Sequence, residues 1–537
     1  MYAVRALDAV IAILLALLAG TLLSDGLPVT VVEGRVVTVR AQDVLLVVLA
    51  VVAARWSLAM PRLSVRHPTR LVAMGVVLYA LVFSVISVGQ HRTLRTHAMD
   101  LGYYVQVVWA LGHGLTPHET LLEQHAWAGH LSPVLYLLAP LGRLPDVAVG
   151  LLVFQSIALA LGAVPLYRLA RRRIGDRGAG ALACVYLLNP SLHGINTKDF
   201  HTAALAIPLL LTAMDALDSK HVTLFWVGTI LTLTTREDAA IAVLGLGLWT
   251  ALAQRRRVLG VVVGLLGLGW LFASVEWIVP LFRGTAYPYF TTRYGHLGES
   301  LGAIVLSPLL RPRAVLEVLL SARRLCYLAA LLAPLAFLPV AAPLATVGAV
   351  PALAQNLLNS DPVLFNYRTQ YQSFVLPFLL VASVDGFERL VVGGTGKIVT
   401  ARRVLGLAVL ASLALSARTV NGLAVSRWRP EEGARAAQRL IATIPASASV
   451  VTEERLFPHV AQRARVFLFP TGLDRSDYVF VNGARLDGGR IARVPARREG
   501  ATVVIAPAAA NEPRQYRFRI AAEDAGFLLL RPASEGP

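Results

Sequence analysis

Ionisable and aromatic side chains gather in four groups in this sequence, and each group lies at the end of an apolar stretch. The first group begins with Asp100 and continues through a segment that carries several imidazoles, among them His125 and His130. A carboxylate beside imidazoles can act as a general base next to anionic ligand groups. Alternatively, Asp100 caps a helix expected over residues 101–112, a common role for aspartate.

The second group is the run Asn196-Thr197-Lys198-Asp199-Phe200-His201 at a junction between two apolar stretches. Lys198 can hold a phosphate as a point charge, while Asp199 and His201 can bind a metal or orient a hydroxyl. The alternative is a capped helical hairpin in which Lys198 and Asp199 pair with each other.

The third group is Arg236-Glu237-Asp238, again between two apolar stretches. Three consecutive charges are expensive at such a position, so we expect them to have a function. Pairing of Arg236 with Glu237 or Asp238 would reduce that cost.

The fourth group combines arginines with interleaved tyrosines. Guanidinium groups bind phosphate bidentately and aromatic rings pack on the apolar faces of sugars, so the group is suited to a sugar phosphate. The same residue types also serve as ordinary anchors at membrane interfaces. The group consists of Arg283, Tyr287, Tyr289, Arg293, Tyr294 and His296, joined by Asp361, Tyr367, Arg368 and Tyr371.

The composition places these groups in a membrane protein. Of 537 residues, 56% are apolar and 15% are charged, against roughly 25% charged residues in soluble domains. A soluble enzyme is therefore excluded. The net charge of +18 is typical of cytoplasmic Lys and Arg anchors, and we expect no nucleic-acid partner. The two cysteines, Cys184 and Cys326, lie in apolar stretches and cannot build a disulfide framework or a thiolate cluster.

A helix needs about 20 apolar residues to cross a bilayer, and a scan on that basis predicts an α-helical polytopic membrane protein with about thirteen transmembrane helices. The first stretch lacks a signal-peptide cleavage site and is interpreted as a retained helix. The apolar run 131–144 is interpreted as interfacial or re-entrant, with a crossing as the alternative. The predicted spans are 7–24, 43–60, 71–89, 147–170, 178–196, 202–217, 222–236, 238–253, 258–282, 324–339, 341–358, 374–390 and 404–425.

Loop charges predict the orientation, because short loops rich in Arg and Lys stay in the cytoplasm. With a cytoplasmic N-terminus, five such loops, at 62–70, 171–177, 220, 255–257 and 397–403, fall on the cytoplasmic side. The loops 90–146 and 283–323 and the part after residue 426 then face outward. All four groups consequently lie on the extracytoplasmic face of the plasma membrane, where one site would be open to a lipid-borne substrate.

The chain changes character after residue 426. Short β-rich runs occur at 449–452, 466–469 and 478–481, with turn signals at 482–483 and 487–489. This pattern predicts a small extracytoplasmic α/β domain. The expected organisation is therefore N-terminal transmembrane helices over 1–70, a transmembrane core over 71–425 and the outer domain over 426–537.

At these residues the chain resembles a family of uncharacterised bacterial and archaeal membrane proteins, related in pattern to the C-type (GT-C) integral-membrane glycosyltransferases. The resemblance covers about residues 70–530. Its motifs are Asp100-Leu101-Gly102, Gly129-His130-Leu131-Ser132-Pro133, Lys198-Asp199-Phe200-His201, Arg236-Glu237-Asp238, Arg293-Tyr294-Gly295, Ile444-Pro445-Ala446, Pro458-His459 and Asp477-Tyr478.

The resemblance implies a GT-C-like core that transfers a sugar from a polyprenyl-phosphate donor to an unidentified cell-envelope acceptor. Asp100 would then be the base that deprotonates the acceptor, although this chain has one acid where better-known members have an adjacent pair. His125, His130 and His201 would bind phosphate oxygens or, with Asp199 or Glu237, a divalent cation, although no metal motif of fixed spacing is present. The residues expected to bind donor phosphate or substrate are His125, His130, Lys198, Asp199, His201, Arg236, Glu237, Asp238, Arg293, Tyr294 and Arg368.

Two other classes of function remain open at this point. A transporter or lipid-handling protein would use the same charges to line a path, and a scaffold would use them to cap helices. Transporters often show internal repeats and helices broken at the membrane midplane. Here no repeat is visible and the charges gather at one predicted face, which favours the transferase.

Overall fold

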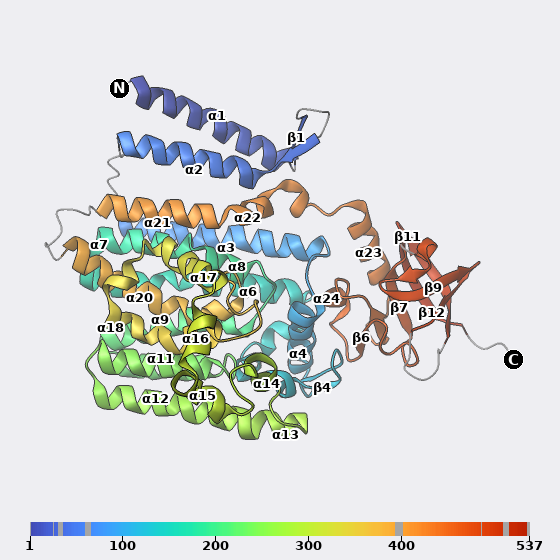
Figure 1. Ribbon diagram of the computed structural model, residues 1–537. Helices are drawn as coiled ribbons and strands as arrows, with labels where there is room; N and C mark the ends of the chain where they lie inside the picture. The colour runs from blue at the N-terminus through green and yellow to red at the C-terminus, as the bar shows by residue number, and fades with distance from the viewer. Residues whose placement is uncertain are drawn as a thin grey trace.

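The computed structural model describes residues 2–24, 26–30, 36–59, 66–392, 401–484, 486–507 and 515–533. It consists of a bundle of helices with a β-sheet domain at one end (Figure 1). We call the end of the bundle that adjoins this C-terminal domain the domain end, and the opposite end the far end.

Long apolar helices identify the protein as a multi-pass membrane protein. Within the described residues, five helical stretches are long and apolar enough to cross a bilayer, and the bent pair Ala401–Leu415 (α21) and Ala417–Leu423 makes a sixth. The five are α1 (Tyr2–Ser24), α2 (Ala41–Leu58), α3 (Pro68–Arg92), Val147–Leu187 and Arg257–Arg283.

The stretch Val147–Leu187 contains α6 (Val147–Leu161) and α7 (Ala163–Leu187), and α7 is broken at Gly175, where φ is 72°. The Tyr186 hydroxyl donates to the carbonyl of Leu159, and the Tyr167 hydroxyl donates to Asp176 at 3.0 Å. Residues before the break therefore lie beside residues after it, so the chain turns back on itself. This matches the two predicted spans 147–170 and 178–196, and glycine permits the positive φ at the turn.

The other predicted spans are built from shorter helices, so the expected thirteen spans do not correspond to thirteen long helices in the described residues. The predicted spans 324–339 and 341–358 are divided into α17 (Ala322–Leu332), two 3₁₀ turns, α18 (Pro343–Thr346) and α19 (Val350–Leu357). Pro334, Pro339 and Pro343 lie at these breaks, because proline cannot donate a helical hydrogen bond and clashes with the preceding turn.

The centre of the bundle is one continuous apolar core. Fully buried Tyr186, Phe225, Trp249 and Phe378 belong to it. Large apolar side chains such as Val258, Leu265 and Leu81 are exposed on its outside, as a lipid-facing surface requires. The remaining helices around this core are α8 (Pro190–Asn196), α9 (Ala206–Asp218), α10 (Val222–Leu233), α11 (Ala239–Leu252), α12 (Arg257–Phe272), α13 (Val279–Arg283), α20 (Leu376–Phe387) and α22 (Ala417–Val420).

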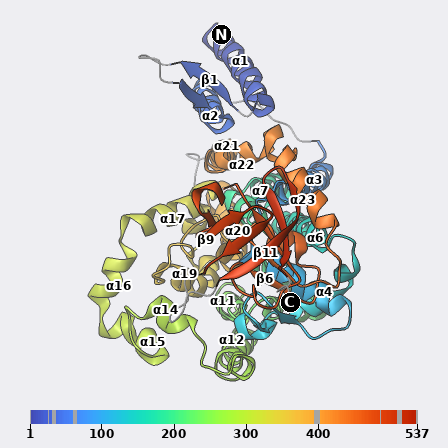
Figure 2. The same ribbon diagram turned by 90° about the vertical axis from the view of Figure 1, so that its right-hand side faces the viewer.

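The C-terminal domain is a mixed sheet with two helices, as the β-rich runs predicted (Figure 2). β5 is parallel to both β6 and β7, and the other neighbouring strands are antiparallel. In spatial order the strands are β6 (Val466–Leu468), β5 (Val450–Thr452), β7 (Tyr478–Asn482), β12 (Phe527–Pro532), β11 (Tyr516–Asp524), β10 (Thr502–Ile505), β9 (Val494–Glu499) and β8 (Arg490–Ile491), with helices α23 (Glu432–Ala442) and α24 (Phe457–Val460).

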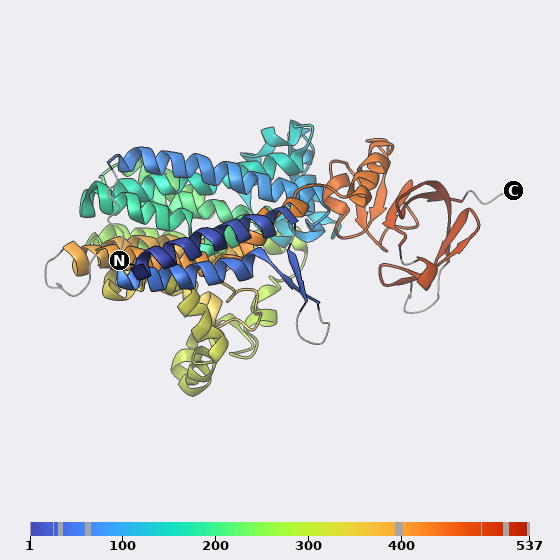
Figure 3. The ribbon, with the colours of Figure 1, turned by 90° about the horizontal axis from the view of Figure 1, so that it is seen from above.

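The predicted outer loops take different forms. Residues 90–146 fold into short elements that pack on the C-terminal domain, including a π-helical turn at Ala98–Gly102, α4 (Tyr103–Gly112) and α5 (Ala126–Gly129). The run 131–144 forms two 3₁₀ turns, which are too short to cross a membrane. The second loop forms α14 (Tyr289–Tyr294), α15 (Leu301–Leu310) and α16 (Pro312–Leu319), part of which projects from the side of the bundle (Figure 3).

Candidate functional site

Asp100 lies in the π-helical turn that joins α3 to α4, at the domain end. The turn is held on both sides. The Ala98 amide donates to Glu454 of the C-terminal domain at 3.1 Å, and the Asp100 Oδ1 lies 3.0 Å from the His201 Nε2. His201 is fixed in turn because its amide donates to the Gln155 Oε1 at 2.9 Å. Asp100 therefore belongs to the π-helical turn and forms a hydrogen bond with His201, while 39% of its side chain is exposed.

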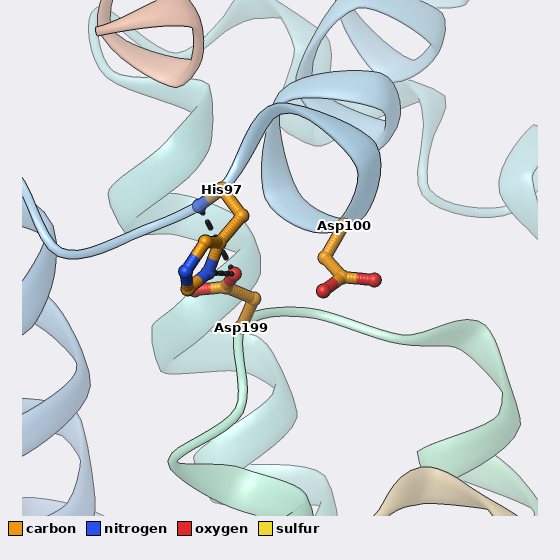
Figure 4. A group of neighbouring side chains, drawn as sticks. All are labelled: His97, Asp100 and Asp199. Carbon is orange, nitrogen blue, oxygen red and sulfur yellow. Dashed lines mark hydrogen bonds and ion pairs between the residues drawn. The ribbon is translucent and has the colours of Figure 1, made fainter. Parts of the chain in front are cut away.

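Asp199 faces the same point from the other side (Figure 4). Its Oδ2 accepts from the His97 amide at 3.1 Å and lies 2.9 Å from the His97 Nδ1. Asp199 is buried and has a φ of 58°, a conformation that residues other than glycine seldom adopt. The pairing of Lys198 with Asp199, which was the alternative interpretation of this group, is absent among the described ion pairs, since Asp199 pairs with His97 instead.

The charges around Asp100 keep it ionised. Burial raises the pKa of this carboxyl, but the hydrogen bond and charge of His201, with smaller contributions from His97 and Lys198, outweigh burial and hold the pKa below its ordinary value. The hydrogen bond to Asp199 raises the pKa of His97 against the effect of its partial burial. Asp100 is thus in the protonation state that a proton acceptor requires.

His97, Asp100 and Asp199 can also hold a metal ion. One ligand atom from each lies within 4.8 Å of the others. Imidazole and carboxylate are suitable ligands for a divalent cation. The sequence had suggested His125, His130 and His201 as the imidazole ligands. Of these, His201 contacts Asp100, and His97 takes the ligand position beside Asp199.

Glu237 is the centre of a second cluster at the same end. Its Oε1 lies 2.7 Å from the His130 Nδ1 and accepts from the Tyr287 hydroxyl at 3.0 Å, while its Oε2 accepts from the Leu131 amide at 3.0 Å. Burial raises the pKa of Glu237, but the charge and hydrogen bond of His130, followed by the charge of Arg236, lower it overall. Through its hydrogen bonds with His130 and Leu131, Glu237 therefore connects the loop 90–146 to the junction between α10 and α11.

Arg236 forms an ion pair with Asp238 of its own group, one of the two pairings considered from the sequence. Its Nε and Nη2 donate to the two oxygens of Asp238 at 2.6 and 2.5 Å. Its guanidinium lies 4.9 Å from the centroid of the Tyr371 ring, and only 4% of its side chain is exposed. Asp238 also accepts from Gln355 at 3.2 Å. Arg236 and Asp238 therefore stabilise the wall of the site, contrary to the expectation that Arg236 binds donor phosphate directly.

The fourth group completes this wall. The Arg293 Nη2 donates to the Tyr371 hydroxyl at 3.2 Å, and its guanidinium lies 4.4 Å from the Tyr289 ring centroid. The Tyr289 ring stacks on His130 at 5.3 Å. Tyr294 donates to the carbonyl of Gln355. Arg293 is half-buried and lies beside the rings of Tyr289 and Tyr371, and its binding of a sugar phosphate stays a prediction.

Polar contacts join the two clusters. Thr202 lies 3.4 Å from the Tyr104 hydroxyl and 3.2 Å from the Ser132 hydroxyl, and the Tyr104 ring approaches His201 edge-on. His125 does not reach either cluster, because it stacks on Phe282 at 4.2 Å. The structure thus unites Asp100, Asp199, His201, His130, Glu237 and Arg293 at one end of the bundle, and it places His125 apart.

Lys198 and Arg368 lie on a cavity of about 560 Å³ beside Asp199. The sequence had identified only these two of its cations. The other cations of the cavity could have been noticed because they are arginines near the outward ends of predicted spans. Lys and Arg are normally enriched at the cytoplasmic ends instead. The charged residues of this basic cavity are Arg40, Arg95, His97, Lys198, Asp199, Arg368, Arg418 and Arg427.

Comparison with known proteins decides the family. The sequence pattern of the family described as "Predicted membrane protein (DUF2079)" matches residues 90–528. This chain belongs to the DUF2079 family. The membership confirms the resemblance drawn from the motifs. No curated protein matches this DUF2079 chain.

Solved structures relate the DUF2079 fold to the GT-C glycosyltransferases. ArnT from Cupriavidus metallidurans bound to undecaprenyl phosphate has a TM-score of 0.50 and 14% identity, over 87% of this chain and 99% of that chain. The apo state of the same protein has a TM-score of 0.46 and 14% identity, over 86% and 99%. ArnT is a GT-C glycosyltransferase, so the predicted GT-C-like architecture with a C-terminal sheet domain is confirmed.

Proposed function

We propose that this protein transfers a sugar from a polyprenyl-phosphate donor to a cell-envelope acceptor at the extracytoplasmic face, with Asp100 as the base. The observation that carries the proposal is the position of an ionised, partly exposed Asp100 close to a basic cavity at the end of a GT-C-like bundle. The match to ArnT, which was solved with undecaprenyl phosphate, supports a polyprenyl lipid as partner.

The reaction needs one proton acceptor and one place for a leaving phosphate. The acceptor hydroxyl oxygen attacks the anomeric carbon and forms the new C–O bond, while the bond from that carbon to the phosphate oxygen breaks. The electron pair leaves on the phosphate, and the hydroxyl proton passes to Asp100. Because the phosphate is already a good leaving group, the main tasks of the protein are to orient the acceptor and to stabilise negative charge.

Each cluster has a task in this scheme. His201 orients the Asp100 carboxylate through the 3.0 Å hydrogen bond, and Lys198 supplies a positive charge beside it. The wall formed by His130, Tyr289 and Arg293 offers rings and a guanidinium to a sugar phosphate. Arg236 and Glu237 hold this wall in place through Asp238 and His130.

A complementation experiment in cells that lack the protein tests the assignment of Asp100. We expect mass spectrometry to find a glycosylated envelope product lost in these cells and its donor lipid accumulated. The wild-type chain should restore the product. Asp100→Asn should lower it by at least about a hundredfold, since general bases typically contribute a factor of 10² to 10⁴. Asp487→Asn, at an exposed position of the C-terminal domain, is the matched control and should restore the product fully.

The opposite results are equally informative. Near-normal restoration by Asp100→Asn would show that Asp100 is not the base. Accumulation of a glycolipid on one side of the membrane, with its chemical structure unchanged, would instead favour a transporter. Both variants should reach the membrane in wild-type amounts, which immunoblotting of membrane fractions checks.

A further inference from the structure

The basic cavity holds far more positive charge than one phosphodiester needs. Six cations line it, namely Arg40, Arg95, Lys198, Arg368, Arg418 and Arg427, against the single carboxylate of Asp199. That carboxylate already forms a hydrogen bond with His97. Among the described residues, Lys198, Arg368 and Arg418 form no ion pair with a carboxylate. Such a concentration of like charge is unfavourable unless an anion neutralises it.

Arg368 shows that a ligand group is expected there. Its Nη2 donates to the Thr419 hydroxyl at 3.0 Å, whereas its Nη1 is buried with no hydrogen-bond partner. A buried guanidinium nitrogen without an acceptor is costly, and a rotation of the Arg368 side chain within the cavity that it lines would bring this nitrogen to an anionic oxygen.

The charge of the ligand follows from chemistry. A sugar joined to a lipid through one phosphate carries a single negative charge, because the phosphate is a diester. A sugar joined through a diphosphate carries two. After transfer, a released lipid monophosphate carries up to two negative charges and a released lipid diphosphate up to three. A cavity of about 560 Å³ in which Lys198, Arg368 and Arg418 form no described ion pair with a carboxylate is matched better by a diphosphate, whose several oxygens can engage different cations at once.

The N-terminal hairpin, which consists of α1 and α2, forms one wall of the cavity through Arg40 and Gln42. Arg40 and Gln42, at the start of α2, lie outside the matched residues 90–528. The Gln42 amide donates to the Asn421 Oδ1 at 3.0 Å, and the Asn421 Nδ2 donates to the Gln42 Oε1 at 2.9 Å. Leu45 and Leu49 of α2 pack on Ala417 of α22 in a small apolar core. These contacts hold the start of α2 beside the end of α22, so that Arg40 lines the same cavity as Arg418 and Asn421.

We propose that the basic cavity binds a diphosphate group, and that the N-terminal hairpin is part of this binding site through Arg40. A diphosphate that links donor sugar and lipid would make the donor of the proposed function a sugar on a polyprenyl diphosphate instead of on a single phosphate, and this identification rests on the proposed function. The binding of a diphosphate in the cavity does not rest on the proposed function, because it needs neither Asp100 nor sugar transfer.

Calorimetric titration of the purified full-length chain in detergent micelles tests the proposal. The probes are inorganic pyrophosphate and inorganic phosphate, and we expect pyrophosphate to bind at least about tenfold more tightly. Arg40→Ala and Arg418→Ala should each weaken pyrophosphate binding about tenfold, as the loss of one charge-assisted contact predicts. Arg40→Lys should recover part of the affinity. Arg313→Ala, at an exposed position of α16, is the control and should leave the affinity unchanged.

A second arm separates the two sources of diphosphate. Polyprenyl diphosphate and polyprenyl phosphate are each used to displace pyrophosphate from micellar protein. Stronger displacement by the diphosphate lipid would identify a lipid ligand, and displacement by neither lipid would identify a free diphosphate.

Two results would overturn the proposal. One is equal affinity for phosphate and pyrophosphate, and the other is a pyrophosphate affinity that Arg40→Ala and Arg418→Ala leave unchanged. Asp100→Asn should bind pyrophosphate at least as tightly as the wild type even if it transfers no sugar, because it removes a negative charge beside Lys198. Failure of the base assignment and failure of the diphosphate site therefore give different results.

Discussion

At the scale of single residues, similar charges have separate roles because their partners differ. Asp100 is partly exposed and meets one imidazole, so it remains open to an incoming hydroxyl. Glu237 is buried and accepts three hydrogen bonds, so its carboxylate is fully used in holding the loop 90–146. Exposure and the number of hydrogen-bond partners, rather than residue type, separate the proposed base from the carboxylate that positions the loop.

Glu119 provides a test of the electrostatics near the site. It is fully buried in the loop 90–146, its Oε2 accepts from the Leu122 amide at 2.8 Å, and its Oε1 has no hydrogen-bond partner. Burial raises the pKa of this carboxyl from 4.5 to about 6. The folded state therefore binds more protons than the unfolded state between pH 4.5 and about 6, and stability must fall as the pH rises through this window.

We expect Glu119→Gln to remove this pH dependence. The glutamine cannot ionise, so the variant should be more stable than the wild type by about 2 kcal/mol above pH 7 and nearly equal to it at pH 4. Unfolding midpoints in detergent between pH 4 and pH 8 measure the effect. Glu317→Gln, at an exposed position, should show no such trend. A stabilisation of equal size at every pH would contradict the assigned cause.

At the scale of elements, close contact between short helices places the charges of the basic cavity. Gly194 of α8 packs directly on the backbone of Arg368, and a Cβ atom at Gly194 would lie 2.5 Å from the Arg368 Cα. Asn189 caps α8 through the Ser191 amide. The position of Arg368 in the cavity therefore depends on the missing side chain at Gly194.

Gly194→Ala should displace Arg368. We expect a loss of about 1–3 kcal/mol in stability, as overpacking usually produces, together with weaker pyrophosphate binding. Thermal unfolding and the titration described above measure the two effects. Gly269→Ala in α12, where no atom lies within 4 Å of the added methyl group, is the control and should cause neither change. Unchanged stability and affinity in Gly194→Ala would show that the packing against Arg368 is not tight.

The sequence predicted the elements better than their contacts. Apolar runs and β-rich runs gave the bundle and the sheet domain, because local composition determines both. The partner of Asp199 could not be predicted, since the His97 contact depends on how α3 ends beside α8. Arg40 and Arg418 were also missed as binding residues, because they approach each other only through the packing of α2 on α22.

At the scale of the whole molecule, the C-terminal domain and the loop 90–146 form one unit. Phe457 and Val466 share an apolar core with Leu101 and Val105. The Gln106 Nε2 donates to the carbonyl of Arg463 at 3.3 Å. The C-terminal domain and the candidate site must therefore lie on the same side of the membrane.

The far end differs in its charges. Arg172 pairs with Asp215 at 2.6 Å and with Asp218 at 2.7 Å, while Arg173 pairs with Asp218 at 2.5 Å. Further arginines lie at the same end, with Arg255 and Arg256 in the short turn between α11 and α12 and Arg257 as the first residue of α12. Such turns resist translocation across the membrane, so we expect the far end to be cytoplasmic and the domain end extracytoplasmic.

Labelling of single cysteines can decide this orientation. In a chain with Cys184→Ser and Cys326→Ser, we expect Asp487→Cys to react with a membrane-impermeant maleimide in intact spheroplasts. Arg257→Cys should react only after permeabilisation, because it lies at the start of α12 at the far end. Labelling of both positions in denatured protein controls for thiol reactivity. The reverse labelling pattern would place the four groups of ionisable and aromatic residues on the cytoplasmic side. A donor carried on the outer leaflet could not reach Asp100 there.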